Sequence, residues 1–382
     1  MNIKFGAPID SMCPDYSEVD LNAKVIDAES VRGLEQIITD AGGVIACEIK
    51  EDGYRCQPHV NRKKVQLFTR QLTEFETKCL PEIVDALHAL KLQNTILDAE
   101  IIGKCGRYNG FKSIQKRARY TGVSEQCIGK YFKEGKVNEF PLELIVFDVM
   151  MHKGKSCIEL PYTARREIVE QIARHQRISP TLAFLFSKPT EVIDLYRNKV
   201  LNGMCEGLVL KQPNLPYMPG DKKHWIKLKK FEPVDLVVVG LMRSTRSDVK
   251  AKYGQAMVAT YREDADLYQT VGVVNLLRQN DLTGRLFAED VQDGISEMLD
   301  IKPINVEYGK NLPDVYVAPE KSVVLEIGAM NFDHGNKDFA CRLNGEKSYS
   351  LRSAHVRIIR DDKAPNQATT TEKIAQLHKM QK

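Results

Sequence analysis

Short hydrophobic runs rich in β-branched residues alternate with helix-like segments between residues 44 and 209. Runs of this kind, bounded by turn residues, predict strands. Hydrophobic residues at helical spacing predict helices over Phe75 to Leu92 and Thr163 to Arg174. Strands with interspersed helices are typical of an α/β or α+β domain. The strand-like runs are VIACEIK, VQLFTR, TILDAEII, LELIVFDVM and GLVLK.

The pattern changes near Phe231-Glu232-Pro233, where a lysine-rich stretch ends. Beyond it, helical patterns occur only at about Asp281 to Asp300 and in the C-terminal tail. Several short strands in so short a segment predict a small β-barrel. We therefore expect two domains, residues 1–231 and 232–382. The strand-like runs of the second are VDLVVVGLM, AMVATYR, YQTVGVV, VVLEIGAM and HVRIIR.

The composition is that of an ordinary globular protein, with 43% hydrophobic and 28% charged residues among 382. This excludes a mainly disordered or fibrous chain. The 55 basic residues exceed the 51 acidic ones by only four, a balance that neither demands nor excludes nucleic acid. The nine cysteines are scattered without C-x-x-C spacing, which predicts no zinc site or disulfide framework.

We expect an intracellular protein without membrane contact, because the N-terminus lacks the hydrophobic core of a secretory signal. No hydrophobic run approaches the roughly 18 residues of a membrane span. Nucleus and cytoplasm are not distinguished.

The most informative segment is Lys50-Glu51-Asp52-Gly53-Tyr54-Arg55, at the end of a predicted strand. A lysine in this position is held at the rim of a sheet, where ligands bind in open sheets. The alternative is a hairpin turn with solvated charges, because Asp-Gly is an ordinary turn pair. The hexapeptide alone leaves both interpretations open.

Four further segments follow this one in order: Leu97-Asp98-Ala99-Glu100, Phe147-Asp148-Val149-Met150, Glu206 to Lys211, and Trp225-Ile226-Lys227-Leu228-Lys229. Together, from about Val44 to Lys363, they resemble the nucleotidyltransferase motifs of ATP-dependent DNA ligases and their capping-enzyme and RNA-ligase relatives. The resemblance implies an α+β adenylation domain (a nucleotidyltransferase, ATP-grasp-like) followed by an OB-fold β-barrel domain. Ala99 departs from the family, which usually has glycine there.

The resemblance also implies a role for each matching residue. Lys50 would form the covalent Lys–AMP, Glu48 would contact the adenine edge, and Phe147 would stack on the base. Glu100 and Glu206 offer oxygen ligands that suit Mg²⁺, for which Mn²⁺ could substitute. The remaining ATP or AMP contacts would be Arg55, Arg70, Glu100, Lys227, Lys229, Arg357 and Arg360.

The chemistry requires a neutral lysine amine. With an ordinary pKa of about 10.4, only about one lysine in 10³ is neutral near pH 7. Nearby cations lower the pKa of an amine, and we expect Arg55, Lys227 and Lys229 to do so for Lys50.

The segment from Ser350 to Lys363 resembles the closing motif of the ligase barrel, which orients the departing pyrophosphate. Ser353-Ala354-His355 replaces part of the family pattern, so the choice between Arg357 and Arg360 stays open. The alternative is a basic edge strand that prevents aggregation.

Basic residues are clustered between Gly103 and Tyr120, with no acidic residue among them. They predict DNA phosphate contacts, and the alternative is a solvated helix face. The residues are Lys104, Arg107, Lys112, Lys116, Arg117 and Arg119.

These observations predict an ATP-dependent DNA ligase that seals nicks in double-stranded DNA through Lys50–AMP and a 5′-adenylated strand. An RNA ligase and a GTP-dependent capping enzyme are the nearest alternatives, and a non-catalytic nick-binding scaffold is an alternative of another class. Fewer than fifty residues precede Lys50, so we expect a compact form without a helical DNA-binding domain. The pathway (replication, repair or end joining) and any accessory protein partner stay open.

Overall fold

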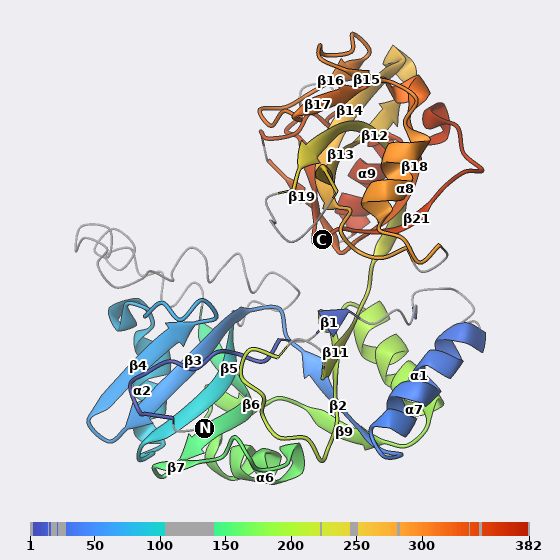
Figure 1. Ribbon diagram of the computed structural model, residues 1–382. Helices are drawn as coiled ribbons and strands as arrows, with labels where there is room; N and C mark the ends of the chain where they lie inside the picture. The colour runs from blue at the N-terminus through green and yellow to red at the C-terminus, as the bar shows by residue number, and fades with distance from the viewer. Residues whose placement is uncertain are drawn as a thin grey trace. The chain divides into compact units, whose positions relative to one another are not determined.

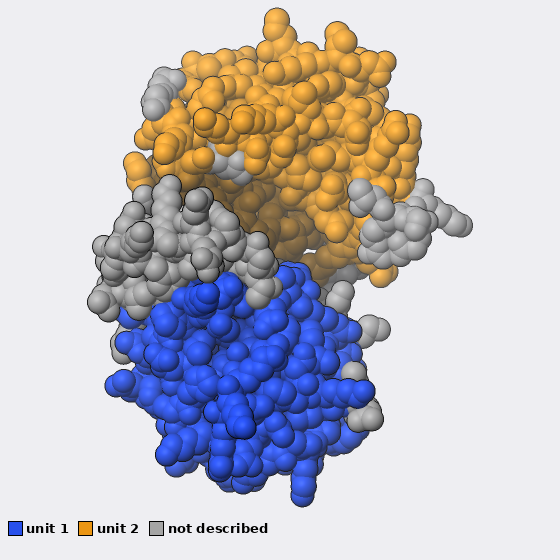
Figure 2. All heavy atoms as spheres, turned by 90° about the vertical axis from the view of Figure 1, so that its left-hand side faces the viewer, with its two compact units in different colours: residues 1–230 blue, residues 231–382 orange. Residues whose placement is uncertain are grey.

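The computed structural model describes residues 3–13, 15–16, 21, 28–103, 141–221, 224–244, 251–280, 283–335, 337–343 and 346–380. It divides into two compact units, Met1–Lys230 and Phe231–Lys382 (Figure 2). Within the described residues, no helix has the length and hydrophobicity that crossing a membrane requires.

The first sheet of the first unit has the strand order β1-β11-β10-β2-β9 (Figure 1). β10 is antiparallel to both of its neighbours, β11 and β2. One face of this sheet packs on two helices, α1 (Ala28–Asp40) and α7 (Pro189–Tyr196), around a core that includes Leu34, Ile49 and Leu208. The strands are β1 (Asp15–Tyr16), β2 (Ile45–Lys50), β9 (Ala183–Phe186), β10 (Gly207–Lys211) and β11 (Trp225–Lys229).

The second sheet of this unit has the order β4-β3-β5-β6-β7, with β8 beside β6. Its outer face packs on α2 (Pro81–Ala89) and α6 (Tyr162–Ile172) through residues such as Leu87 and Val169. The strands are β3 (Tyr54–Asn61), β4 (Lys64–Thr69), β5 (Thr95–Gly103), β6 (Leu142–His152), β7 (Lys155–Ser156) and β8 (Ile178–Pro180).

The second unit is a curled sheet built on the long strand β12 (Glu232–Arg243). β12 pairs with β13 (Tyr253–Arg262) and with β18 (Val324–Ala329), which in turn pairs with β21 (His355–Ile359). A register shift between Val238 and Gly240 marks a bulge, and bulges bend strands. Gly240 also lacks space for a side chain, because an added Cβ would lie 2.5 Å from Pro313.

Several shorter elements complete the second unit. α8 (Phe287–Gly294) and α9 (Thr371–Met380) contribute Phe287, Val291 and Ile374 to its core. The remaining strands are β14 (Leu267–Asn275), β15 (Met298–Leu299), β16 (Val306–Glu307), β17 (Val315–Val317), β19 (Asn331–His334) and β20 (Tyr349–Arg352). A mixed α+β unit followed by a curled β half-barrel, consistent with an OB fold, confirms the predicted fold class.

The ten predicted strands are confirmed within a few residues, but two predicted helices are shorter than expected. The helix expected from Phe75 begins only at Pro81, after a 3₁₀ turn at Thr77–Cys79. Proline suits the first helical position, because its missing N–H would have no helical partner there. The helix expected over residues 281–300 is confined to α8.

Candidate active site

The segment from Lys50 to Arg55 connects the two sheets of the first unit. β2 ends at Lys50 and pairs with β9 and β10, whereas β3 begins at Tyr54 and pairs with β4 and β5. The hairpin interpretation is therefore wrong. Gly53 is required in this crossing, because an added Cβ would lie 2.2 Å from the carbonyl oxygen of Ile101. Lys50 is thus the last residue of a strand in the first sheet, and Arg55 is the second residue of a strand in the second sheet.

The face of the first sheet opposite α1 and α7 carries polar side chains in rows across three strands. Lys50 lies opposite Gly207, which lies opposite Lys229. In the next row, Glu48 and Lys227 flank Val209. Because side chains two residues apart share a face of a strand, the alternation in IACEIK and WIKLK gathers these groups on one side.

Glu206, directly before β10, connects the two lysines of the first row. Its Oε2 accepts a hydrogen bond from Lys50 Nζ, and its Oε1 accepts one from Lys229 Nζ. The Lys50 side chain is 22% exposed, whereas Glu206 and Lys229 are buried. Burial alone would raise the pKa of Glu206, but the two ammonium groups outweigh it and lower this pKa below its ordinary value.

The environment of Lys50 differs from the sequence expectation. Burial acts to lower the pKa of Lys50, but the carboxylates of Glu206, Glu100 and Asp52 raise it above its ordinary value. The expectation that cations lower this pKa is wrong for this arrangement, because Lys229 and Arg55 are each paired with a carboxylate. The amine of Lys50 is therefore held in its protonated form by these carboxylates.

Glu100 lies opposite Arg55 in the β3–β5 pairing, close enough to Lys50 and Glu206 for their charges to interact. Burial is the largest of the effects that raise its pKa to about 7, with Glu206 and Asp98 adding to the rise and Lys50 and Arg55 opposing it. Two carboxylates close to each other favour a cation between them. The described part of the chain contains no cluster of three or more His, Cys, Asp or Glu side chains suited to a metal.

Arg55 is held by a forked ion pair on the second sheet. Its Nε lies 2.9 Å from Asp98 Oδ1, and its Nη2 lies 2.5 Å from Asp98 Oδ2. The guanidinium carbon lies 5.2 Å from the ring centre of Phe147 and 5.8 Å from that of Trp225. Phe147 belongs to the second sheet and Trp225 to the first, so Arg55 spans the space between the two sheets.

Glu48 is buried and bound through both oxygens. Its Oε1 accepts a hydrogen bond of 2.6 Å from the Tyr162 hydroxyl, and its Oε2 lies 2.7 Å from Lys211 Nζ. Lys211 also donates to the carbonyl oxygen of Phe147 at 3.2 Å and lies 4.0 Å from the Trp225 ring centre. One buried cluster therefore connects the predicted adenine-edge residue with the predicted stacking residue.

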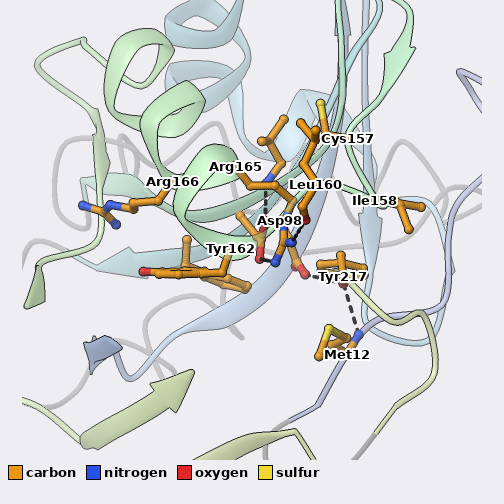
Figure 3. A network of polar contacts seen from close by, with 12 residues as sticks. Met12, Asp98, Cys157, Ile158, Leu160, Tyr162, Arg165, Arg166 and Tyr217 are labelled. Atoms are coloured by element: carbon orange, nitrogen blue, oxygen red, sulfur yellow. Dashed lines mark hydrogen bonds and ion pairs between the residues drawn. The ribbon is translucent and has the colours of Figure 1, made fainter. Parts of the chain in front are cut away.

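A second buried pair supports the strand that carries Phe147. Arg165, from α6, binds Asp148 at 2.7 and 3.1 Å. Its Nη1 donates to the carbonyl oxygens of Leu160 and Leu215 (Figure 3). These four hydrogen bonds connect α6 with β6, with the segment directly before α6 and with the loop that follows β10.

Sequence reasoning did not single out Asp98, Tyr162, Lys211, Tyr217 or Trp225 as site residues. Asp98, Lys211 and Trp225 lie inside the recognised motifs, so their positions in the sequence could have identified them as site residues. Tyr162 and Tyr217 lie outside those motifs, and only their contacts identify them.

Three further predicted nucleotide contacts remain, one in the first unit and two in the second. Arg70 follows β4 and is exposed, next to Thr69, which lies opposite Cys56 in β3. Arg357 and Arg360 belong to the second unit. There, Arg357 pairs with Glu326 at 3.3 Å, and Arg360 pairs with Asp235 at 2.9 Å and Asp362 at 2.7 Å.

The six residues predicted to bind DNA lie outside the described residues: Lys104, Arg107, Lys112, Lys116, Arg117 and Arg119.

Comparisons with known proteins agree on one family. A family model described as "ATP dependent DNA ligase domain" matches residues 26–229. The chain is 30% identical over 370 residues to a probable DNA ligase of Dictyoglomus turgidum, covering 93% of this chain and 60% of that protein. It is 29% identical over 363 residues to a DNA ligase of Thermococcus fumicolans, covering 93% and 58%. The chain thus spans about three fifths of the length of these relatives.

A solved structure described as "Pmar-Lig_PreS3" has the same fold, with a TM-score of 0.55 and 18% identity. The match covers 92% of this chain and 68% of that one.

Proposed function

The chain belongs to the family of ATP-dependent DNA ligases, and on that premise we propose that it seals nicks in double-stranded DNA with ATP. The observation that carries the proposal is the row formed by Lys50, Glu206 and Lys229. It combines a partly exposed amine at a strand end with a second cation and a carboxylate. Binding DNA without catalysis would need no such nucleophile, so the row favours an enzyme over a scaffold.

The described residues that would bind ATP come from both sheets of the first unit. Lys227 and Lys229 share a face with Lys50 and suit the phosphates. Phe147 is half-buried, which leaves part of its ring available for stacking on the base. Glu48 would meet the adenine edge, and Arg55 with Glu100 would meet the ribose and phosphate side.

In the first step, the Lys50 amine attacks the α-phosphorus of ATP. A P–N bond forms, and the bond from the α-phosphorus to the bridging oxygen breaks, so that pyrophosphate leaves with that electron pair. Lys50 must first lose the proton that Glu206 holds in place, which passes to solvent water at its partly exposed amine. Lys227 and Lys229 stabilise the negative charge that develops on the phosphates.

Glu100 and Glu206 are the residues that would hold a Mg²⁺ ion. Magnesium is commonly bound through one or two carboxylates together with substrate phosphates, which suits a site with two carboxylates. Such an ion would supply positive charge that offsets the phosphates and weakens the hold of Glu206 on the Lys50 proton.

In the later steps, AMP passes from Lys50 to the 5′-phosphate at the nick. The adjacent 3′-hydroxyl then attacks that phosphate and releases AMP. The basic residues between Lys104 and Arg119 stay our prediction for the DNA contacts.

Incubation with ATP or GTP labelled at the α-phosphate, followed by a denaturing gel, tests the proposal. We expect a covalent label with ATP and sealing of nicked DNA. A label from GTP alone would favour a capping enzyme, and sealing confined to nicked RNA would favour an RNA ligase. The absence of a label from both nucleotides would contradict the proposal.

Removing divalent cations with a chelator should lower Lys50 adenylation by at least about 10²-fold, because the phosphate charge is then not offset. Adding Mg²⁺ or Mn²⁺ should restore it, as measured by the rate of covalent labelling. Glu100→Gln should raise the Mg²⁺ concentration needed for half-maximal rate, whereas Glu159→Gln, on the surface, should not. Full labelling in chelator would show that no divalent cation takes part.

Arg360→Ala should slow Lys50 adenylation by about 10²-fold yet leave sealing of a pre-adenylated nick within about threefold. Pyrophosphate leaves only in the first step, so a group directed at it stabilises that transition state alone. Arg357→Ala is the matched variant, because Arg357 also pairs with Glu326. The opposite pattern, normal adenylation with lost sealing, would show that the closing motif is misaligned.

A further inference from the structure

Two buried tyrosines make the same kind of contact at two different parts of the candidate site. The Tyr162 hydroxyl donates to Glu48 Oε1 at 2.6 Å, and the Tyr217 hydroxyl donates to Asp98 Oδ2 at 2.7 Å. Tyr162 is 3% exposed and Tyr217 is 1% exposed. Each hydroxyl therefore holds a carboxylate that water does not reach freely, and such hydrogen bonds orient their acceptors strongly.

Tyr162 competes with an arginine for Glu48. Arg166 Nη1 lies 3.8 Å from Glu48 Oε1, too far for a hydrogen bond, and this buried nitrogen has no hydrogen-bond partner among the described residues. A buried donor without a partner is costly and would donate a hydrogen bond to a nearby carboxylate oxygen. Loss of the Tyr162 hydroxyl would therefore let Glu48 turn toward Arg166.

Lys211 binds the other oxygen of Glu48 and restricts the orientation of the carboxylate. Its Nζ lies 2.7 Å from Oε2 and within 5.2 Å of the Phe147 and Trp225 ring centres. With Lys211 on one oxygen and Tyr162 on the other, the plane of the carboxylate is defined. Each oxygen keeps a further lone pair for a ligand.

Tyr217 holds a different part of the site. Its oxygen accepts the backbone N–H of Met12 at 3.1 Å while its hydroxyl donates to Asp98 (Figure 3). Asp98 in turn holds Arg55 through two hydrogen bonds. Tyr217 therefore acts on the group expected at the sugar and phosphate side, whereas Tyr162 acts on Glu48.

We propose that Tyr162 is a positioning residue that sets base selectivity, by orienting Glu48 to accept the exocyclic amine of adenine. Tyr217 positions Arg55 and leaves base selectivity unchanged. The inference rests on the proposed use of ATP.

Tyr162→Phe and Tyr217→Phe form the matched pair for the test, because each removes one buried hydroxyl bound to a carboxylate. Adenylation is measured with ATP and with purine riboside triphosphate, which lacks the 6-amino group. We expect Tyr162→Phe to reduce the preference for ATP, as the ratio of kcat/KM values, by about tenfold. Tyr217→Phe should raise KM for both nucleotides by a similar factor and keep their ratio.

Binding without reaction supplies a second readout. Trp225 is the single tryptophan of the chain, and its ring lies beside Lys211 and Phe147. Its fluorescence therefore reports on nucleotides at this position. Titration with α,β-methylene-ATP and with the α,β-methylene form of purine riboside triphosphate should show the same loss of preference in Tyr162→Phe.

A rescue variant separates positioning from general damage. Tyr162→Phe combined with Arg166→Leu removes the competing donor, and it should recover part of the ATP preference. An unchanged ratio in Tyr162→Phe, or an equal change in Tyr217→Phe, would overturn the inference. If the wild type forms no adenylate, the proposed function fails, whereas the fluorescence titration still tests the role of Tyr162. If Tyr162→Phe unfolds in thermal denaturation, Tyr162→His replaces it. The same loss of preference for ATP is expected for Tyr162→His.

Discussion

Replacing Lys50 with alanine is expected to lower covalent labelling from ATP by at least about 10³-fold, because β2 then ends without the amine that attacks the α-phosphorus. The measurement is the rate at which label from the α-phosphate of ATP becomes covalently attached to the protein. The variant should remain folded, since the Lys50 side chain is partly exposed and Glu206 keeps its contact with Lys229. The free energy of unfolding should fall by less than about 1 kcal/mol.

Two arginine variants separate the need for a nucleophilic amine at Lys50 from the need for positive charge at Lys229. Lys50→Arg keeps a cation beside Glu206 but offers no nucleophilic amine, because a guanidinium stays protonated. We expect it to be as inactive as Lys50→Ala. Lys229→Arg keeps both the charge and Lys50, and it should retain labelling within about tenfold, since its role is electrostatic.

A nick that already carries 5′-AMP bypasses the attack by Lys50, so both Lys50 variants should still seal it. Labelling of Lys50→Ala at the wild-type rate would overturn the assignment of the nucleophile.

Glu206→Gln is expected to lower adenylation by at least about 10²-fold, because one change removes a proposed metal ligand and the charge that separates two lysines. In the wild type, Glu206 holds Lys50 and Lys229 on its two oxygens. With an amide in its place, two ammonium groups face each other across Gly207. We expect the free energy of unfolding to fall by about 1–3 kcal/mol, since buried charges lose their partner.

The rate of labelling is measured against Mg²⁺ concentration, well below the unfolding transition of the variant. Glu206→Asp is the matched variant, because it keeps the charge on a shorter side chain, and it should be less impaired than Glu206→Gln. If Glu206→Gln were to adenylate at the wild-type rate without added magnesium, Glu206 would act neither as a metal ligand nor as the charge that separates the two lysines.

The elements themselves show where sequence patterns are informative. β2 and β10 could be predicted because β-branched and hydrophobic residues concentrate in IACEIK and GLVLK. The start of α2 was misplaced, because the hydrophobic spacing of Phe75 and Cys79 continues through a 3₁₀ turn. α1 and α7 were not predicted, although Leu34 and Ile38 have helical spacing and pack in the core.

The sequence by itself determined which residues can do the chemistry. Strand alternation places Glu48 and Lys50 on one face, and Lys227 and Lys229 on one face, whatever the strand order, because side chains two residues apart point the same way. The five motifs in order identified the family and predicted the nucleophile.

Only the tertiary structure decided the partners of those residues. Lys50 and Glu206 are 156 residues apart, and Tyr162 and Glu48 are 114 apart. Their pairing depends on strand order, on the crossing at Gly53 and on the packing of α6, none of which local pattern encodes. The charge state of Lys50 follows from this pairing: its pKa is raised because carboxylates, rather than cations, are its nearest charged neighbours.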